Sequence, residues 1–194
     1  MKKLVLFFAV FFLAVSAYAI DLKTGSFAAL AGQERVRVDF DFSDVMIDGM
    51  TLENFLELGV VDDDFKDWND FVNFIKRRFL AGINSDTYKF VEGMVFFTGE
   101  SEAAFSIMVS PAMMNIDGKY IINYSLVDNE TGKVLGTAYQ AGDGGTFGSF
   151  SNLQGDGFEE AAEAFKKFLN KQLKPEYFIS CNNLKIIVLS KTVA

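Results

Sequence analysis

Histidine is absent from all 194 residues, and the sequence holds one cysteine and two prolines. The lack of histidine excludes catalytic triads and general bases built on imidazole, and it excludes most zinc sites. The single Cys181 rules out an internal disulfide and has no histidine to activate it as a nucleophile. We expect it to be buried as a small apolar residue rather than exposed as a free thiol that cross-links chains. No catalytic residue, metal ligand or cofactor site is therefore predicted.

The first residues carry the pattern of a secretory signal peptide. Lys2 and Lys3 form a positive start, residues 4–15 are an unbroken apolar run, and 17–19 is Ala-Tyr-Ala, with small residues where a signal peptidase reads them. The run is too short for a spanning helix, which needs about 20 residues. We expect cleavage after Ala19, loss of Met1–Ala19, and a periplasmic or secreted protein of a Gram-negative bacterium. No cysteine follows the cleavage site, so no stable membrane anchor is expected.

Acidic residues and phenylalanine are what the sequence has in excess. Loss of Lys2 and Lys3 with the signal peptide leaves 26 acidic against 16 basic residues. Such a charge repels nucleic-acid phosphates and anionic lipid head groups, so neither is expected as a partner. The 22 phenylalanines indicate a bulky core rather than a disordered linker. The length suits one domain, placed at residues 34–194 after a flexible lead-in at Ile20–Gln33 that is rich in glycine and alanine.

Periodic apolar positions predict three elements in the first half of this domain. Residues 34–42 alternate as a strand whose buried face holds Val36, Val38, Phe40 and Phe42. Residues 51–58 suit a short helical turn. A longer helix is predicted to begin at Asp62–Asp64 and to end at Gly82, a residue type that favours a helix C-terminus. Its apolar stripe consists of Phe65, Trp68, Val72, Ile75 and Phe79, widened by Phe71.

Four strand-like segments follow, at Thr87–Phe97, Ala103–Met114, Lys119–Val127 and Lys133–Gln140. Two glycine-containing turns join the last three of them. Asp117-Gly118 is typical of a tight turn, and Asp128–Gly132 fits a type I turn followed by a glycine at positive φ. We therefore expect an antiparallel meander in the middle of the domain.

A glycine-rich segment and a second amphipathic helix complete the chain. Ala141–Gly157 holds six glycines and is predicted to be irregular. Asp156, with Glu159 three residues later, is typical of a capping box at a helix start. Pro175 is expected to end this helix, and Leu184–Leu189 is predicted as a last, buried strand. The apolar face of the helix consists of Phe158, Ala161, Ala162, Phe165, Phe168 and Leu169.

The predicted order is β-α-β-β-β-β-α-β. It indicates an α+β fold, with a mainly antiparallel sheet and two amphipathic helices on one face, as in a two-layer α/β sandwich. The first and last strands each adjoin a helix in the sequence, so they are the pair expected to be able to lie parallel.

Three motifs in this order resemble those of a group of small bacterial envelope domains. They are the strand Tyr88-Lys-Phe-Val-Glu-Gly93, the hairpin Leu126-Val-Asp-Asn-Glu-Thr-Gly-Lys-Val-Leu135, and the helix end Phe168-Leu-Asn-Lys-Gln-Leu173 that follows the glycine-rich stretch. The order is similar to that of the N-terminal domain of TolB and of the CsgG curli-secretion protein, in which an Asp-x-x-Thr-Gly hairpin precedes a final amphipathic helix. The resemblance spans residues 34–175 and implies a role in envelope assembly or binding, without catalysis.

The glycine-rich segment supplies the candidate binding site. Its large side chains Phe147, Phe150 and Leu153 follow neither a helical nor an alternating period, so we expect them on a mobile loop that contacts a partner. The alternative is that they fold back over the sheet edge as part of the core. A phosphate loop is not expected at 142–148, because no Gly-Lys-Ser/Thr follows and Asp143 would repel phosphate.

Three other patterns have both a structural and a functional interpretation. Asp62–Asp64 suit a helix N-terminus better than a calcium site, because the three acids are contiguous. Asp39 and Asp41 share a strand face at about 7 Å, a spacing that a glycosidase pair can have, but Arg35 and Arg37 on that face favour a solvated surface. The phenylalanines either fill the core or line a pocket for an apolar ligand.

These patterns together predict an exported, non-enzymatic cell-envelope domain that binds a protein or another envelope component. Two alternatives stay open: a periplasmic carrier of a lipid or other apolar ligand, and a hydrolase built on carboxylates. Neither the identity of the partner nor the oligomeric state follows from the sequence.

Overall fold

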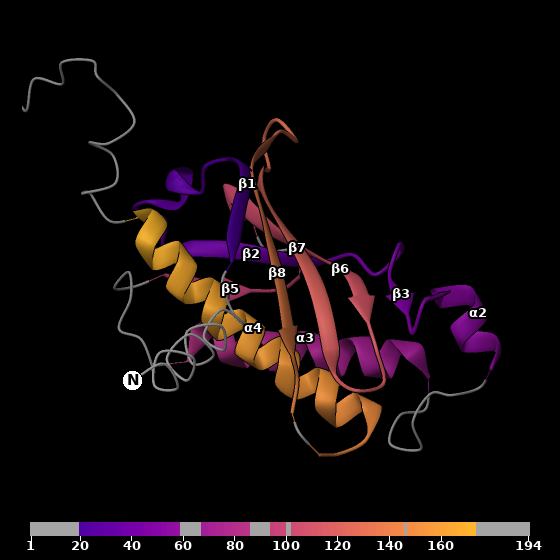
Figure 1. Cartoon of the computed structure of the whole chain (residues 1–194). Coiled ribbons are helices and arrows are strands. Elements are labelled where there is room, and N and C mark those ends of the chain that lie inside the picture. The colour runs from indigo at the N-terminus through magenta and orange to yellow at the C-terminus, as the bar shows by residue number, and fades with distance from the viewer. Residues whose placement is uncertain (1–19, 59–66, 86–93, 100–101, 146, 174–194) are drawn as a thin grey trace, which may run out of the picture.

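Two long helices pack against one face of a mainly antiparallel sheet, which confirms the predicted α+β fold (Figure 1). The computed structural model describes residues 20–58, 67–85, 94–99, 102–145 and 147–173. The strands are β1 (Asp21–Gly25), β2 (Arg35–Phe40), β3 (Met46–Ile47), β4 (Met50–Thr51), β5 (Val95–Phe97), β6 (Phe105–Met114), β7 (Lys119–Asp128) and β8 (Val134–Asp143). The helices are the 3-10 helix η1 (Ala28–Leu30), α2 (Leu52–Glu57), α3 (Trp68–Asn84) and α4 (Phe150–Leu173).

The strands lie in the order β1-β8-β7-β6-β2-β5. Strands β6, β7 and β8 form an antiparallel meander, as predicted, and β1 extends it at one edge. The prediction was wrong for β5, which does not pair with β6. Instead, β2 lies between them and runs parallel to both. Parallel neighbours need a crossover connection, and α3 supplies it between β2 and β5.

Alternation along the strands places one row of side chains under the helices. In β2, Val36 and Val38 are buried, as the sequence pattern predicts. Val38 pairs with Ile107 of β6, and Val109 pairs with Tyr124 of β7, so the buried rows continue across the sheet. The Tyr124 ring stacks on Phe165 of α4 with ring centroids 4.1 Å apart. Aromatic rings thus fill the space between the sheet and the helices.

The predicted flexible lead-in at Ile20–Gln33 is wrong. Strand β1 pairs with the first half of β8, with Asp21 opposite Tyr139. Phe27 and Leu30 are fully buried beneath the end of α4. The Phe27 ring meets the edges of Phe165 and Phe168 at 5.7 and 5.4 Å. Phe27 and Leu30 anchor this segment in the core, although its glycine and alanine content had suggested a flexible lead-in.

Helix α3 begins at Trp68, where the Asp67 side chain caps it by accepting from the Asp70 N–H at 3.0 Å. The predicted stripe is confirmed at Ile75 and Phe79, which are buried, while Asp62–Asp64 and Phe65 lie outside the described residues. Gly82 does not end the helix, which runs on to Asn84. Gly82 is instead a packing position where α3 touches the backbone of α4.

Helix α4 begins at Phe150, so most of the expected irregular segment is regular. Strand β8 extends to Asp143, which leaves only residues 144–149 as the connection. The predicted capping box is also wrong, because Asp156 lies inside the helix and forms an ion pair with Arg78 of α3. Gly155 faces the Phe74 ring, and an ideal Cβ there would lie 2.5 Å from Phe74 Cε1. The predicted apolar face of the helix is confirmed, since all six of its residues are buried.

The two predicted turns are confirmed. Gly118 adopts φ +86° and its N–H donates to the Asn115 carbonyl at 3.0 Å. Gly132 adopts φ +67° and donates to the Asp128 carbonyl at 2.8 Å. The predicted last strand at Leu184–Leu189, Pro175 and Cys181 lie outside the described residues. Within the described ranges, none of the helices combines the length and the apolar character that crossing a bilayer requires.

Candidate functional site

The structure separates the three side chains that the sequence grouped as a binding loop. Phe147 lies in the β8–α4 connection with 91% of its surface exposed. Phe150 instead begins α4 and stacks on Phe71 at 5.2 Å. Leu153 is buried in the next turn. The expectation of a partner-contacting loop therefore fails for Phe150 and Leu153, which are packing residues, and only Phe147 remains a candidate contact.

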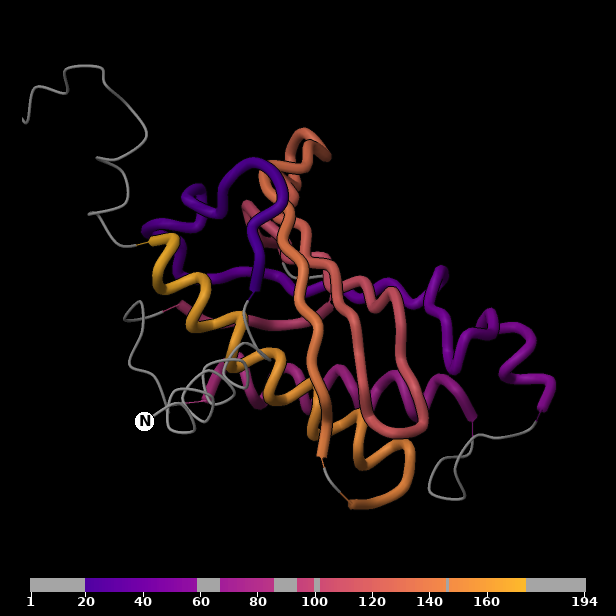
Figure 2. The backbone as a smooth tube through the Cα atoms, in the orientation of Figure 1, coloured from indigo at the N-terminus to yellow at the C-terminus, as the bar shows by residue number. Residues whose placement is uncertain are grey.

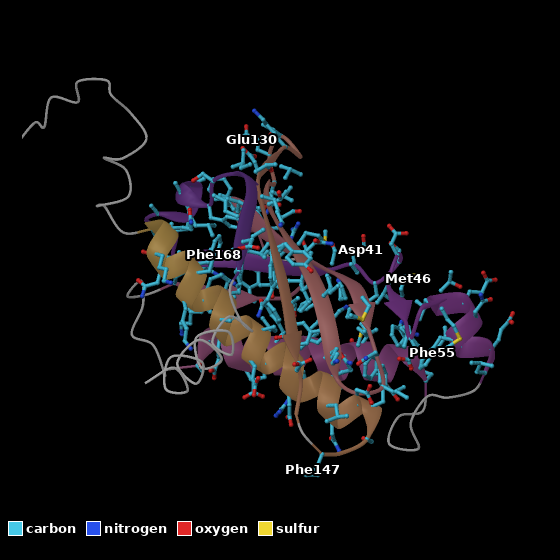
Figure 3. All side chains as sticks on the ribbon, in the orientation of Figure 1. Asp41, Met46, Phe55, Glu130, Phe147 and Phe168 are labelled. Atoms are coloured by element: carbon cyan, nitrogen blue, oxygen red, sulfur yellow. The ribbon has the colours of Figure 1, made fainter. Side chains whose placement is uncertain are left out.

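Phe147 belongs to a larger surface, which we name the acidic–apolar end. It comprises three segments: residues 41–58 (the β2–β3 connection, β3, β4 and α2), the β6–β7 turn at 115–119, and the β8–α4 connection at 143–149, with residue 146 outside the described residues. The β6–β7 turn and the β8–α4 connection lie at the same end of the sheet, opposite the β7–β8 hairpin (Figure 2). Figure 3 shows Phe147 at this extremity and Glu130 at the other.

Hydrogen bonds join the three segments of this end. The Ile116 N–H donates to Asp48 Oδ1 at 3.2 Å, which ties the β6–β7 turn to the β3–β4 turn. The Gly144 N–H donates to the Gly118 carbonyl at 2.8 Å, which ties that turn to the β8–α4 connection. The rings of Phe55 and Phe150 lie 5.8 Å apart and hold α2 against the start of α4. These contacts connect the three segments to one another at this end of the molecule.

A buried glutamine fixes the central turn. Gln154 of α4 is fully buried, and its amide donates to the Asn115 carbonyl at 2.8 Å. The Asn115 side chain in turn accepts from the Lys119 N–H at 2.7 Å. A turn held by a buried side chain and by its own backbone loses little further entropy when a partner binds.

Large apolar side chains are exposed mainly at this end. The described residues contain eight exposed large hydrophobic side chains, and five of them belong to the acidic–apolar end. These five are Met46 at 37%, Leu56 at 37%, Leu58 at 60%, Ile116 at 54% and Phe147 at 91%. The other three, Leu22, Val95 and Val134, are distributed over β1, β5 and β8.

Negative charge gathers on the same surface. This end contains seven carboxylates and one lysine. The carboxylates are Asp41, Asp44, Asp48, Glu53, Glu57, Asp117 and Asp143, and the lysine is Lys119. In the rest of the described chain, twelve carboxylates are set against ten lysines and arginines. Most of the excess negative charge of the described residues therefore lies at one end.

The carboxylates that the sequence pointed to as a glycosidase-like pair have other partners. Asp39 accepts from Arg37 Nε at 2.9 Å in a half-buried ion pair. The pKa of Asp41 is lowered, chiefly because the Ser43 backbone N–H donates to its carboxylate. A general acid for glycoside hydrolysis needs a raised pKa. The solvated strand face is therefore the better description of these two residues.

An open hollow of about 700 Å³ lies next to the Arg37–Asp39 pair. Arg37, Ala103, Asn129 and the exposed Glu102 and Glu130 are among its lining residues. Asn129 is committed there to structure, because its side chain accepts from Ser106 Oγ at 2.8 Å and donates to the Ala103 carbonyl at 2.8 Å. These bonds brace the β7–β8 hairpin against the start of β6.

The described carboxylate with a raised pKa lies elsewhere, on the surface of α4. Partial burial raises the pKa of Glu160, and the charges of Asp156, Glu163 and Glu159 add to the effect. Arg78 pairs with two of these neighbours, Asp156 and Glu159. The cluster sits on the outside of a helix and not in the hollow. Within the described ranges, no group of three or more acidic or cysteine side chains is arranged to hold a metal ion.

Similarity to known proteins is found at the level of structure. No protein-family model and no curated protein matches the sequence. PelC from Paraburkholderia phytofirmans, solved as a dodecamer, is 12% identical, with a TM-score of 0.41 over 75% of this chain and 97% of that chain. A protein of the DUF330 family from Xanthomonas campestris is 7% identical, with a TM-score of 0.40 over 80% of this chain and 93% of that chain.

Proposed function

We propose that this chain is an exported, non-enzymatic binding module that docks a partner protein through its acidic–apolar end. The observation that carries the proposal is that five of the eight exposed large apolar side chains of the described residues lie on three connected segments at one end of the molecule. Scattered exposed apolar residues need no explanation, whereas an apolar group of this kind on a folded domain marks an interaction site. The N-terminal pattern of residues 1–19 supports export.

Phe147 is the strongest element of this surface. A phenylalanine ring that leaves water can contribute more than any other side chain of this set. Its position on a short connection between two well-packed elements, β8 and α4, is where binding residues are found on a rigid scaffold. Met46 and the exposed leucines of α2 add further apolar side chains to the acidic–apolar end. Figure 3 shows Met46 beside β3, apart from Phe147.

No specific observation favours the two alternatives from the sequence. Aromatic side chains of the core pack on one another instead of lining a lipid pocket, as Phe79 does with Phe40 at 5.5 Å and Phe158 with Tyr120 at 6.1 Å. Of the two carboxylates with a glycosidase-like spacing, Asp39 is held in an ion pair and Asp41 has a lowered pKa. Binding is thus the function that the described geometry supports best.

Site-specific photo-cross-linking in intact cells tests this proposal. A benzophenone amino acid replaces Phe147 in one variant and Val134 in a matched control, since Val134 is an exposed apolar residue at the opposite end of β8. We expect a discrete protein adduct from position 147 and none of that mass from position 134. Equal patterns from both positions, or no protein adduct from position 147, would contradict the proposal.

A further inference from the structure

The charge of the acidic–apolar end specifies what kind of partner fits it. Resting on the proposed function, we propose that the partner protein presents a basic amphipathic segment, with apolar side chains on one face and lysine or arginine beside them. Three properties of this end support such a partner: its distribution of charge, the absence of ion pairs at its carboxylates within the described residues, and the position of its apolar side chains.

The distribution of charge is uneven enough to select a partner. Seven carboxylates and one lysine occupy the acidic–apolar end, while the remainder of the described chain is close to balanced. A surface of one sign attracts a partner of the opposite sign, speeds the encounter and penalises partners of like charge. Anionic lipid surfaces are disfavoured for the same reason.

The carboxylates of this end are available to a partner. Within the described residues, none of the seven belongs to an ion pair, whereas Asp39, Asp156 and Glu159 elsewhere each do. Asp41 and Asp48 accept backbone N–H groups from neighbouring turns, which orients these side chains without neutralising them. A cationic side chain would therefore meet charge that has not been compensated within the described chain.

Exposed apolar and acidic side chains are neighbours in two of the three segments. On α2, Leu56 lies between Glu53 and Glu57 in the exposed part of the helix, and Leu58 follows. In the β6–β7 turn, Ile116 precedes Asp117. A segment with an apolar stripe bordered by cations matches this arrangement, because Leu56 and Ile116 each have an acidic neighbour in the sequence that can form an ion pair with that segment. Apolar burial then supplies affinity, and the carboxylates supply orientation and selectivity.

A designed peptide serves as the probe. It has 18 residues, with leucines on one helical face and lysines on the other, and it is compared with a peptide in which every lysine is replaced by glutamate. Both are titrated against the full chain purified after export, with fluorescence anisotropy as the readout. We expect the lysine peptide to bind at least about tenfold more tightly than the glutamate peptide, and its affinity to fall as salt rises from low to high ionic strength.

Two matched double variants locate the effect. Glu53→Gln with Glu57→Gln removes two charges from the acidic–apolar end, and we expect it to weaken the lysine peptide about threefold or more. Glu34→Gln with Glu130→Gln removes two exposed charges elsewhere and should leave the affinity unchanged. All four residues are exposed, and equal melting temperatures confirm that the variants fold.

The outcomes separate this inference from the proposed function. Equal binding of the two peptides, equal weakening by the two double variants, or tighter binding to neutral phosphatidylcholine vesicles than to the lysine peptide would overturn the inference. If position 147 still cross-links a protein in that case, the proposed function stands and the partner is not basic. If the lysine peptide binds selectively but position 147 yields no protein adduct in cells, the proposed function fails.

Discussion

Gly82 of α3 lies directly against the Glu159 backbone of α4: an ideal Cβ on Gly82 would be 2.3 Å from the Glu159 carbonyl oxygen. The two helices therefore approach backbone to backbone at this point. Beside it, Arg78 Nη1 lies 2.9 Å from Glu159 Oε2, so an ion pair between the helices borders the close contact. A backbone carbonyl cannot turn aside as a side chain can, so the position admits no larger residue without separating the helices.

Gly82→Ala should destabilise the fold by about 1–3 kcal/mol, because the strain of overpacking exceeds the gain in helix propensity. Chemical denaturation of the variant measures this loss. Ala81→Ser, at the neighbouring exposed position, is the control and should have little effect. A Gly82→Ala variant as stable as the parent would mean that the helices do not cross as described.

Gly132→Ala should cost about 1 kcal/mol for a different reason. Gly132 adopts φ +67° in the β7–β8 hairpin, and an added Cβ would meet no atom within 4 Å. The loss is therefore one of backbone conformation alone. Gly132→Asn should cost less than Gly132→Ala, because asparagine tolerates the left-handed region. Equal denaturation midpoints for parent and alanine variant would show that the turn is built differently.

Phe147→Ala and Phe150→Ala should separate binding from stability. Phe147 is 91% exposed, so its truncation should leave the melting temperature unchanged and abolish or weaken partner binding. Phe150 packs on Phe71 and Phe55, so its truncation should destabilise the domain by about 2–4 kcal/mol. Thermal melts and binding titrations of both variants decide the matter. A large loss of stability in Phe147→Ala would make that ring a packing residue.

Glu160→Gln should stabilise the domain at neutral pH. Because the pKa of Glu160 is raised above its ordinary value of 4.5, the folded state holds this proton more tightly than the unfolded state does. Folding stability from this group is then highest below the ordinary pKa and falls as pH rises through the raised value. The variant should therefore melt higher than the parent at pH 7, and the difference should shrink at pH 4. If the difference in melting temperature between variant and parent grew on acidification, the pKa of Glu160 would not be raised in the folded state.

The sequence predicted the elements whose apolar positions repeat. Val36 and Val38 alternate in β2, and Phe158, Ala161 and Phe165 recur at helical spacing in α4, because one face of each element packs on the core. Strand β1 was missed because its five residues are all exposed, so no alternation of buried and exposed positions marks it. The order of the strands in the sheet could not be predicted from local sequence patterns either. The pairing of β5 with β2 depends on where the chain returns to the sheet after α3.

The prediction of an irregular segment after β8 was wrong because it relied on the glycine content of that segment. Gly155 and Gly157 have the composition of a loop, but in α4 they make room for the rings of Phe74 and Tyr120. The same error moved Phe150 and Leu153 out of the core and into a candidate site. Phe147 was proposed from the sequence because it does not fit any period, and the structure leaves it exposed. The rest of the acidic–apolar end was missed because the exposure of Leu56, Leu58 and Ile116 is set by tertiary structure and not by their own sequence context.

The central claim is that the acidic–apolar end is the surface with which this protein binds. Amide hydrogen exchange tests it most directly, on the free chain and on the chain in complex with the protein that cross-links to position 147. The account predicts slower exchange on binding in residues 46–58, 115–119 and 144–149, with the β7–β8 hairpin at 129–133 unchanged. Protection confined to that hairpin or to the exposed faces of α3 and α4, with no change at the acidic–apolar end, would contradict it.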